Sequence, residues 1–108
     1  MIRSLTEADC GDALALYEDL TLGGPISRDP ARFAAILSHP GTVILGFEHR
    51  GRIVSMATLH LMPNMTYRGR PYGLAENVVT AEAERGLGRG KAVMLALLER
   101  AGGRTPTK

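Results

Sequence analysis

Three glycines within five residues stand between a strand-like run and a helix-like run near the end of this 108-residue chain. Residues 72–80 are rich in apolar and β-branched side chains, whereas residues 91–101 carry apolar side chains at helical spacing. A helix start leaves backbone N–H groups unpaired and carries the positive end of the helix dipole. Glycines let a ligand approach those amides closely. The segment therefore predicts an anion site, although a turn that only reverses the chain has the same composition.

Neither common nucleotide motif fits this glycine segment. A phosphate-binding loop of the Walker A type needs a glycine where Arg85 stands and a hydroxyl where Ala92 stands. The dinucleotide fingerprint fails because Gly90 comes one residue too early. The anion must therefore be bound by a different kind of fold.

The rest of the chain reads as alternating helices and strands in one α/β domain. A capping box at residues 6–9 predicts a helix to residue 20, and Asp29-Pro30 predicts a second helix that ends at residues 39–41. Residues 42–47 and 53–62 read as an antiparallel pair of strands joined by a hairpin with Gly51 in its turn. A polar loop over residues 63–71 precedes the strand at 72–80. We expect one domain over residues 1–101 and a tail over residues 102–108.

Composition limits the possible partners. Hydrophobic residues make up 44% and charged residues 22%, which is too apolar for a disordered chain. The net charge of +2 does not indicate nucleic acid, but the first 49 residues carry seven acids against three arginines and the remainder carries ten bases against four acids. The second half could therefore favour an anion. One cysteine, three scattered histidines and the lack of a long apolar segment predict no metal, no membrane association and a cytoplasmic location.

The glycine segment resembles the pyrophosphate-binding signature of the GNAT acyltransferase superfamily, Arg-x-x-Gly-x-Gly at Arg85, Gly88 and Gly90 after an apolar strand. The resemblance covers residues 1 to about 101 and implies a mixed, mainly antiparallel sheet with helices on both faces. It implies transfer of an acetyl group from acetyl-CoA to a primary amine of a small molecule or peptide. In such a protein the strand backbone pairs with the pantetheine arm and the glycine turn holds the pyrophosphate. The cofactor-binding residues implied are Val78, Val79, Thr80, Arg85, Gly86, Leu87, Gly88, Arg89, Gly90 and Lys91.

Glu76 is the candidate catalytic base, because an amine with a pKa near 10.4 is deprotonated in only about four molecules in ten thousand at pH 7. Glu76 interrupts an apolar strand and resembles the strand carboxylate proposed as base in several GNAT enzymes. It could instead be a structural carboxylate bound to a loop N–H or to Arg68. For His60 and Tyr72 packing is the simpler interpretation, although a proton shuttle and an acceptor-pocket residue are the alternatives.

Members of this superfamily usually continue past the glycine-turn helix into another strand, a further helix and closing strands, so the resemblance implies that the C-terminal third is lacking. The strand at 72–80 is then an edge strand, and we expect self-association through it. A tyrosine that protonates the departing thiolate cannot be assigned. Two alternatives to the enzyme stay open: a non-catalytic CoA-binding remnant or regulatory module, and a basic interaction module without cofactor. Arg68 and Arg70 could select an anionic acceptor or simply keep their loop soluble.

Overall fold

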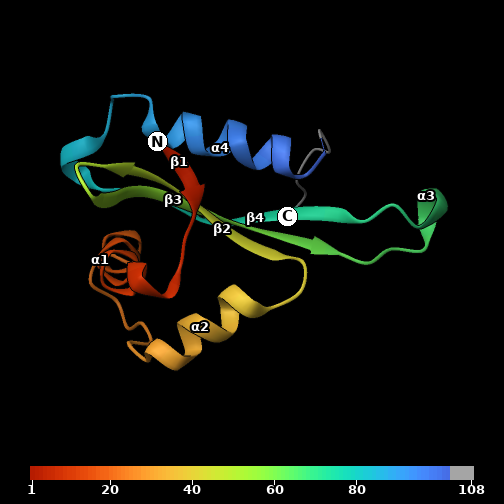
Figure 1. The fold of residues 1–108 in the computed structure, drawn as a ribbon, viewed down its shortest axis with the longest axis horizontal. Coiled ribbons are helices and arrows are strands. Elements are labelled where there is room, and N and C mark those ends of the chain that lie inside the picture. The colour runs from red at the N-terminus through yellow and green to blue at the C-terminus, as the bar shows by residue number, and fades with distance from the viewer. Residues whose placement is uncertain (103–108) are drawn as a thin grey trace.

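The computed structural model describes residues 1–102, which form one antiparallel sheet with helices on both faces (Figure 1). The strand order follows the chain order, β1-β2-β3-β4. The strands are β1 (Ile2–Ser4), β2 (Thr42–His49), β3 (Arg52–Met62) and β4 (Tyr72–Thr80). This confirms the predicted fold class, and the boundaries predicted for β4 agree with those observed.

Two helices cover one face of the sheet and a third covers the other (Figure 1). The first face carries α1 (Cys10–Leu20), which follows the short helix η1 (Glu7–Asp9), and α2 (Pro30–Ser38). The opposite face carries α4 (Arg89–Arg100), which is joined to β4 through the short helix η2 (Glu82–Glu84). β3 and β4 extend beyond the body of the molecule, and the four-residue helix α3 (Thr66–Gly69) lies at the tip of this hairpin.

Local sequence explains how the helices begin. The Asp9 carboxylate accepts the Thr6 backbone N–H at 2.7 Å, as the predicted capping box requires. Asp9 also forms an ion pair with Arg3 at 2.8 Å, and the hydrogen bonds from Arg3 lower the pKa of Asp9 to about 2. The Asp29 carboxylate caps α2 by accepting the Ala31 N–H at 3.0 Å. Charge and capping thus fix both helices on the first face.

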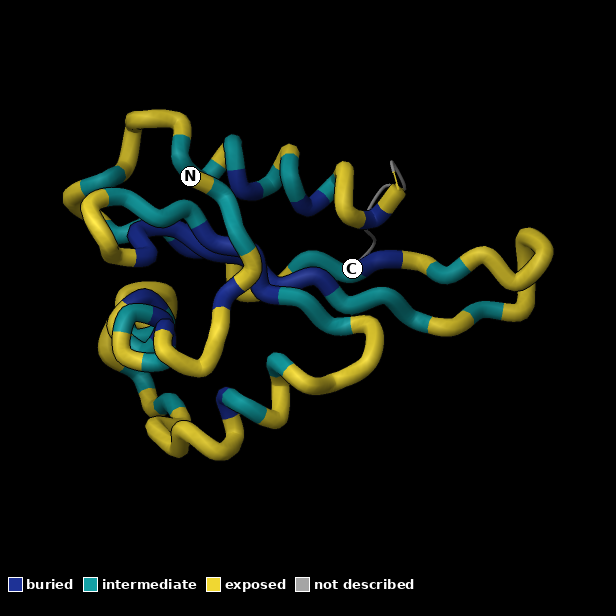
Figure 2. The backbone as a smooth tube through the Cα atoms, in the orientation of Figure 1, coloured by how far each residue is buried: buried dark blue, intermediate teal, exposed yellow. Residues whose placement is uncertain are grey.

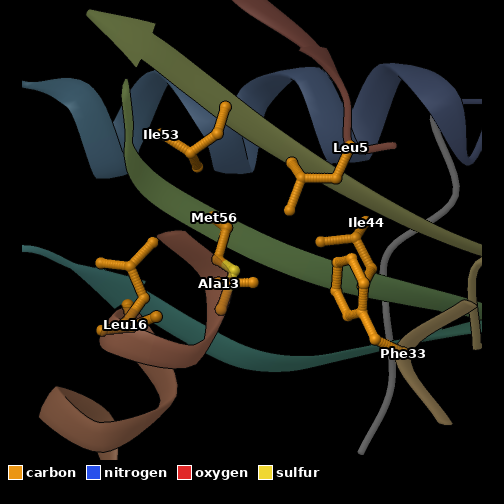
Figure 3. Close-up of a cluster of buried hydrophobic side chains, with 8 residues drawn as sticks. Leu5, Ala13, Leu16, Phe33, Ile44, Ile53 and Met56 are labelled. Atoms are coloured by element: carbon orange, nitrogen blue, oxygen red, sulfur yellow. The ribbon is translucent and has the colours of Figure 1, made fainter. Parts of the chain in front are cut away.

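Each face of the sheet has its own apolar core, and Figure 2 shows in dark blue where the backbone is buried. The core under α1 and α2 is drawn in Figure 3. It contains Leu5, Ala13, Leu16, Phe33, Ile44, Ile53, Met56 and Val79. The core under α4 contains Leu45, Ala57, Leu59, Val93, Leu97 and Ala101.

A β-bulge interrupts the pairing of β4 with β3. Thr58 lies opposite Glu76 and Met56 lies opposite Val79, so two residues of β4 face one residue of β3 between these pairs. The first of the two, Asn77, has a φ of 52°, a left-handed conformation that asparagine tolerates better than most side chains. The bulge lies within the segment predicted to bind the cofactor.

Several features differ from the predictions. β2 continues to His49 and β3 begins at Arg52, so the hairpin turn is shorter than expected, and the short helix η2 was not predicted. β1 was not expected, α3 lies within the predicted loop at residues 63–71, and α4 begins two residues before residue 91. The hairpin turn at Arg50-Gly51 is confirmed, with φ of 53° and 78°. Most of the predicted tail, residues 103–108, lies outside the described residues.

Two kinds of feature are absent from residues 1–102. No helix in this part of the chain is both long and apolar enough to span a bilayer. No group of three or more histidine, cysteine, aspartate or glutamate side chains gathers there as metal ligands would.

Candidate active site

Four of the residues predicted to bind the cofactor line one groove, which lies between the end of β4 and the end of α1. Its volume is about 480 Å³. The lining residues are Asp19, Leu20, Leu22, Val78, Val79, Thr80 and Arg85. The fold therefore brings the end of the predicted pantetheine strand and the arginine of the glycine signature to a shared surface.

The backbone along this groove is partly engaged by nearby side chains. The Ser55 hydroxyl donates to the Val79 carbonyl at 3.2 Å, and Arg85 Nε donates to the Thr80 carbonyl at 3.0 Å. Arg85 therefore lies back against the end of β4. Val78 remains 42% exposed and is the most open of the three strand residues.

The glycine turn requires glycine at two positions for conformational reasons. Gly86 and Gly88 have φ of 80° and 79°, which L side chains rarely adopt, and Gly88 is the residue that caps α4. A Cβ atom at either position would meet nothing within 4 Å. Both glycines thus leave open space above the start of α4.

The backbone amides of this turn have no partner in the described protein. Within residues 1–102, the first N–H group of α4 that donates back to the turn is that of Ala92, which bonds the Gly88 carbonyl at 3.0 Å. The N–H groups of residues 86–91 donate to no atom of that part of the chain. Such a run of unbonded amides at a helix start is the arrangement that binds phosphate groups.

Gly90 has a different reason to be glycine. A Cβ atom there would lie 2.9 Å from the Thr80 hydroxyl, which itself lies 2.8 Å from the Ser55 hydroxyl. Gly90 therefore lets α4 lie directly against β4. This close packing fixes the turn relative to the strand.

The three cations predicted near the anion are not equally available. Arg89 is paired with Glu84 at 3.1 Å and stacks over Phe47 at 5.3 Å, so its side chain is largely buried. Its Nε atom is buried without a partner in the described residues. Arg85 and Lys91 are exposed, and no ion pair holds either of them within residues 1–102. Glu82 and Glu84 read in the sequence as acids of a solvated turn before the helix, but Glu84 is the partner of Arg89.

Glu76 lies on the face of β4 that α1 and α2 cover. It is opposite Thr58, and residues directly opposite in an antiparallel pair point to the same face. Thr58 is buried and shares a hydrogen bond with the Tyr17 hydroxyl, whose pKa is raised by burial. The Glu76 carboxylate is exposed and makes no hydrogen bond or ion pair within residues 1–102, including with Arg68. The carboxylate is therefore available to a ligand.

His60 lies on the same face of the sheet as Glu76, two residues along β3 from Thr58. His60 Nδ1 contacts the Thr42 hydroxyl at 2.9 Å, which also contacts His39 Nδ1 at 3.1 Å, so the His60 ring is held toward β2. Arg68 and Arg70 lie at the far tip of the β3–β4 hairpin (Figure 1). Tyr72 lies at the start of β4, opposite Met62.

Sequence reasoning missed a second cavity, of about 270 Å³, between α1 and α2. Tyr17 and Asn77 both contribute to its wall. Asparagine within an apolar strand could have indicated the bulge, because asparagine adopts left-handed dihedral angles more readily than most residues. Nothing local marked Tyr17, whose contact with Thr58 joins residues far apart in the chain.

Comparisons with known proteins agree on one family. The family model described as the acetyltransferase (GNAT) family matches residues 12–105. A glucosamine 6-phosphate N-acetyltransferase of Trypanosoma brucei brucei is 38% identical over 101 residues, which cover 91% of this chain and 69% of that protein.

Solved structures give the same result. A protein of Agrobacterium tumefaciens str. C58 superposes with a TM-score of 0.89 at 39% identity, covering 95% of this chain and 74% of that one. An acetyltransferase of Trypanosoma brucei superposes with a TM-score of 0.84 at 35% identity, covering 100% and 78%. Glucosamine-6-phosphate N-acetyltransferase of Arabidopsis thaliana gives 0.83 at 25% identity, covering 95% and 74%.

Proposed function

The chain belongs to the GNAT acetyltransferase family, and from that premise we propose that it moves the acetyl group of acetyl-CoA to a primary amine of a small molecule or peptide by direct attack. The family is one of N-acetyltransferases that use acetyl-CoA as co-substrate. The acceptor and the roles of individual residues are the proposed part. Acetyl-CoA supplies the thioester, and the chain supplies binding, orientation and a proton acceptor.

One observation carries the cofactor site: the unbonded N–H groups of residues 86–91 above an open glycine turn. A diphosphate needs several donors directed at one small volume, and a helix start adds a favourable dipole. Arg85 and Lys91 would add positive charge, whereas the Arg89 guanidinium contributes by holding Glu84 and the turn. Val78, Val79 and Thr80 would hold the pantetheine arm along the groove, with Arg85 moving off the Thr80 carbonyl.

Glu76 is the proposed base. Its carboxylate has no partner within residues 1–102 and lies at the bulge, where β4 passes from the exposed Glu76 to the groove residues. A positioned base contributes about 10² to 10⁴ in rate. Correct orientation of amine and thioester supplies about 7 to 11 kcal/mol more, so the residues that hold the cofactor matter at least as much.

The test is acetyl transfer to a panel of amines, measured as CoA release, together with calorimetric titration of CoA. Glucosamine 6-phosphate is the first amine to try, because the trypanosomal relative is named for that substrate. We expect Glu76→Gln to lower kcat by about 10² to 10⁴ while leaving the Kd for CoA unchanged. Glu99→Gln, an exposed acid on α4, is the matched control. Absence of any CoA binding would refute the whole proposal, whereas unchanged kinetics of Glu76→Gln would remove only the base.

We propose further that the chain self-associates through β4, an edge of the sheet formed by residues 1–102. The same strand is the proposed pantetheine site, so CoA should compete with association. Light scattering should give a mass that rises with protein concentration and falls when CoA is added. A mass equal to one chain at every concentration would contradict this.

A further inference from the structure

We propose that the cavity between α1 and α2 binds an apolar group of the acceptor amine, so that the preferred acceptor is an aliphatic or aromatic amine. The proposal rests on the transferase function above and concerns which amine is used. The cavity has a volume of about 270 Å³. Its apolar walls are Leu14, Tyr17, Leu20, Ile26, Phe33 and Ile36.

The position of this cavity connects it to the proposed reaction. Asn77, which follows Glu76 in β4, forms part of its wall. Leu20 lines both this cavity and the cofactor groove, so the two spaces share a wall. The Tyr17 hydroxyl bonds Thr58, the residue opposite Glu76. A ligand group in the cavity would therefore lie beside both the base and the acyl donor.

Three of the polar residues on the cavity wall are engaged by the protein, whereas the side chains of Arg32 and Asn77 make no hydrogen bond or ion pair within residues 1–102. The Asp29 carboxylate accepts the Ala31 N–H, and the Ser27 hydroxyl accepts the Asp29 N–H at 3.3 Å. The Thr21 hydroxyl donates to the Tyr17 carbonyl at 3.0 Å. Apart from Arg32 and Asn77, the wall offers a group with many hydroxyls few replacements for its hydrogen bonds to water, whereas an apolar group gains by leaving water.

The volume fits a group of defined size. An apolar space of this size beside a reaction site is typical of a ligand pocket. An apolar cavity of about 150 Å³ is known to hold benzene. The space between α1 and α2 therefore has room for a phenyl ring or a five- or six-carbon chain.

The experiment compares ethylamine, butylamine and hexylamine, primary amines whose own pKa values are nearly equal, so that differences among these three report binding. With the full chain and saturating acetyl-CoA, kcat/KM is measured for ethylamine, butylamine, hexylamine, 2-phenylethylamine and glucosamine 6-phosphate. We expect about a fourfold rise per added methylene until the cavity is filled. Equal values along the alkylamine series would overturn the proposal. A preference for glucosamine 6-phosphate over hexylamine that remains when kcat/KM is calculated for the deprotonated amine of each would also overturn it.

Ile26→Trp fills the cavity from the loop between α1 and α2 and should lower the hexylamine-to-ethylamine ratio at least tenfold, with the KM for acetyl-CoA unchanged. Leu95→Trp, on the exposed side of α4, is the matched control and should keep the ratio. An unchanged ratio in a folded Ile26→Trp protein would also overturn the proposal.

A binding measurement separates this proposal from the transferase function. If CoA binds but no amine is acetylated, the proposed function fails, yet hexylamine should still shift the NMR methyl signals of Leu14 and Ile26 where ethylamine does not. If the Ile26→Trp variant does not fold, the NMR measurement on the unaltered chain takes its place as the test. No shift with hexylamine would overturn the cavity proposal whatever the activity.

Discussion

The two faces of the sheet are packed in different ways. Under α4 the residues Ala57, Leu59, Val93 and Leu97 are each 0% exposed, and the buried Ser55 hydroxyl on that face is bonded to the Thr80 hydroxyl and the Val79 carbonyl. Under α1 and α2 the sheet instead presents Thr58 with the Tyr17 hydroxyl, and a cavity of about 270 Å³ separates the helices. The comparison teaches that close packing on one face fixes the helix whose start carries the free amides. The looser face keeps space for a ligand.

The largest change in stability is expected from a substitution on the close-packed face, under α4. Leu97→Ala should lower the free energy of unfolding by about 2 to 5 kcal/mol, because the surrounding side chains leave a sealed void. Urea denaturation followed by circular dichroism measures it. Leu95→Ala, on the same helix but 56% exposed, should change stability by less than about 0.5 kcal/mol. Equal losses in the two variants would contradict the assigned packing.

Lowering the pH should destabilise the packing of α1 on the sheet before it affects the packing of α4. Hydrogen bonds from Arg3 lower the pKa of Asp9 to about 2, below its unfolded value near 3.9. The stability that the ionised carboxylate contributes is therefore present above the unfolded pKa and is lost as the pH falls toward 2. The expected loss is about 2 kcal/mol. Denaturation at pH 5 and pH 2 measures it, and Asp9→Asn should remove this part of the pH dependence. Identical pH dependence in that variant would assign the effect to other carboxylates.

The contact between α4 and β4 can be broken by one methyl group. In Gly90→Ala the new Cβ would lie 2.9 Å from the Thr80 hydroxyl, which should destabilise the fold by about 1 to 2 kcal/mol and weaken CoA binding.

The matched control for Gly90→Ala is Gly11→Ala, also at the second position of a helix but with nothing within 4 Å. It should stabilise the protein by about 0.5 kcal/mol. Thermal melts of the two variants in parallel give the comparison. Stabilisation of both variants would show that α4 does not need the close approach.

The smallest change is expected beside the cavity. Leu14→Ala should cost about 1 kcal/mol, because the half-buried side chain borders space that already exists. The same denaturation experiment measures this. A loss as large as that of Leu97→Ala would mean that the two faces are equally well packed.

The elements marked by local signals could be predicted from the sequence. Asp29-Pro30 fixed the start of α2, and the run of β-branched and apolar residues fixed β4. β1 could not be predicted, because its three residues gain their structure from pairing with β2, more than forty residues away. Such a short strand has no stable pattern of its own.

The candidate site divides in the same way. Gly86 and Gly88 indicate a left-handed turn at a helix start, and the observed dihedral angles agree. The burial of Arg89 between Glu84 and Phe47 could not be predicted, because it depends on β2 lying under the turn. The binding roles of residues 78–80 and 85–91, and the role of Glu76 as base, stay predictions.

The bulge at Asn77 acts as a phase shift in β4. Side chains of a regular strand alternate between the faces, so Glu76 and Val79, three positions apart, would lie on opposite sides. The extra residue places both on the α1 side, as their partners Thr58 and Met56 show. Deleting one residue here would send Glu76 into the close-packed layer beneath α4 while Val79 kept its place. The carboxylate thus shares a compartment with Tyr17 because of a single inserted peptide unit.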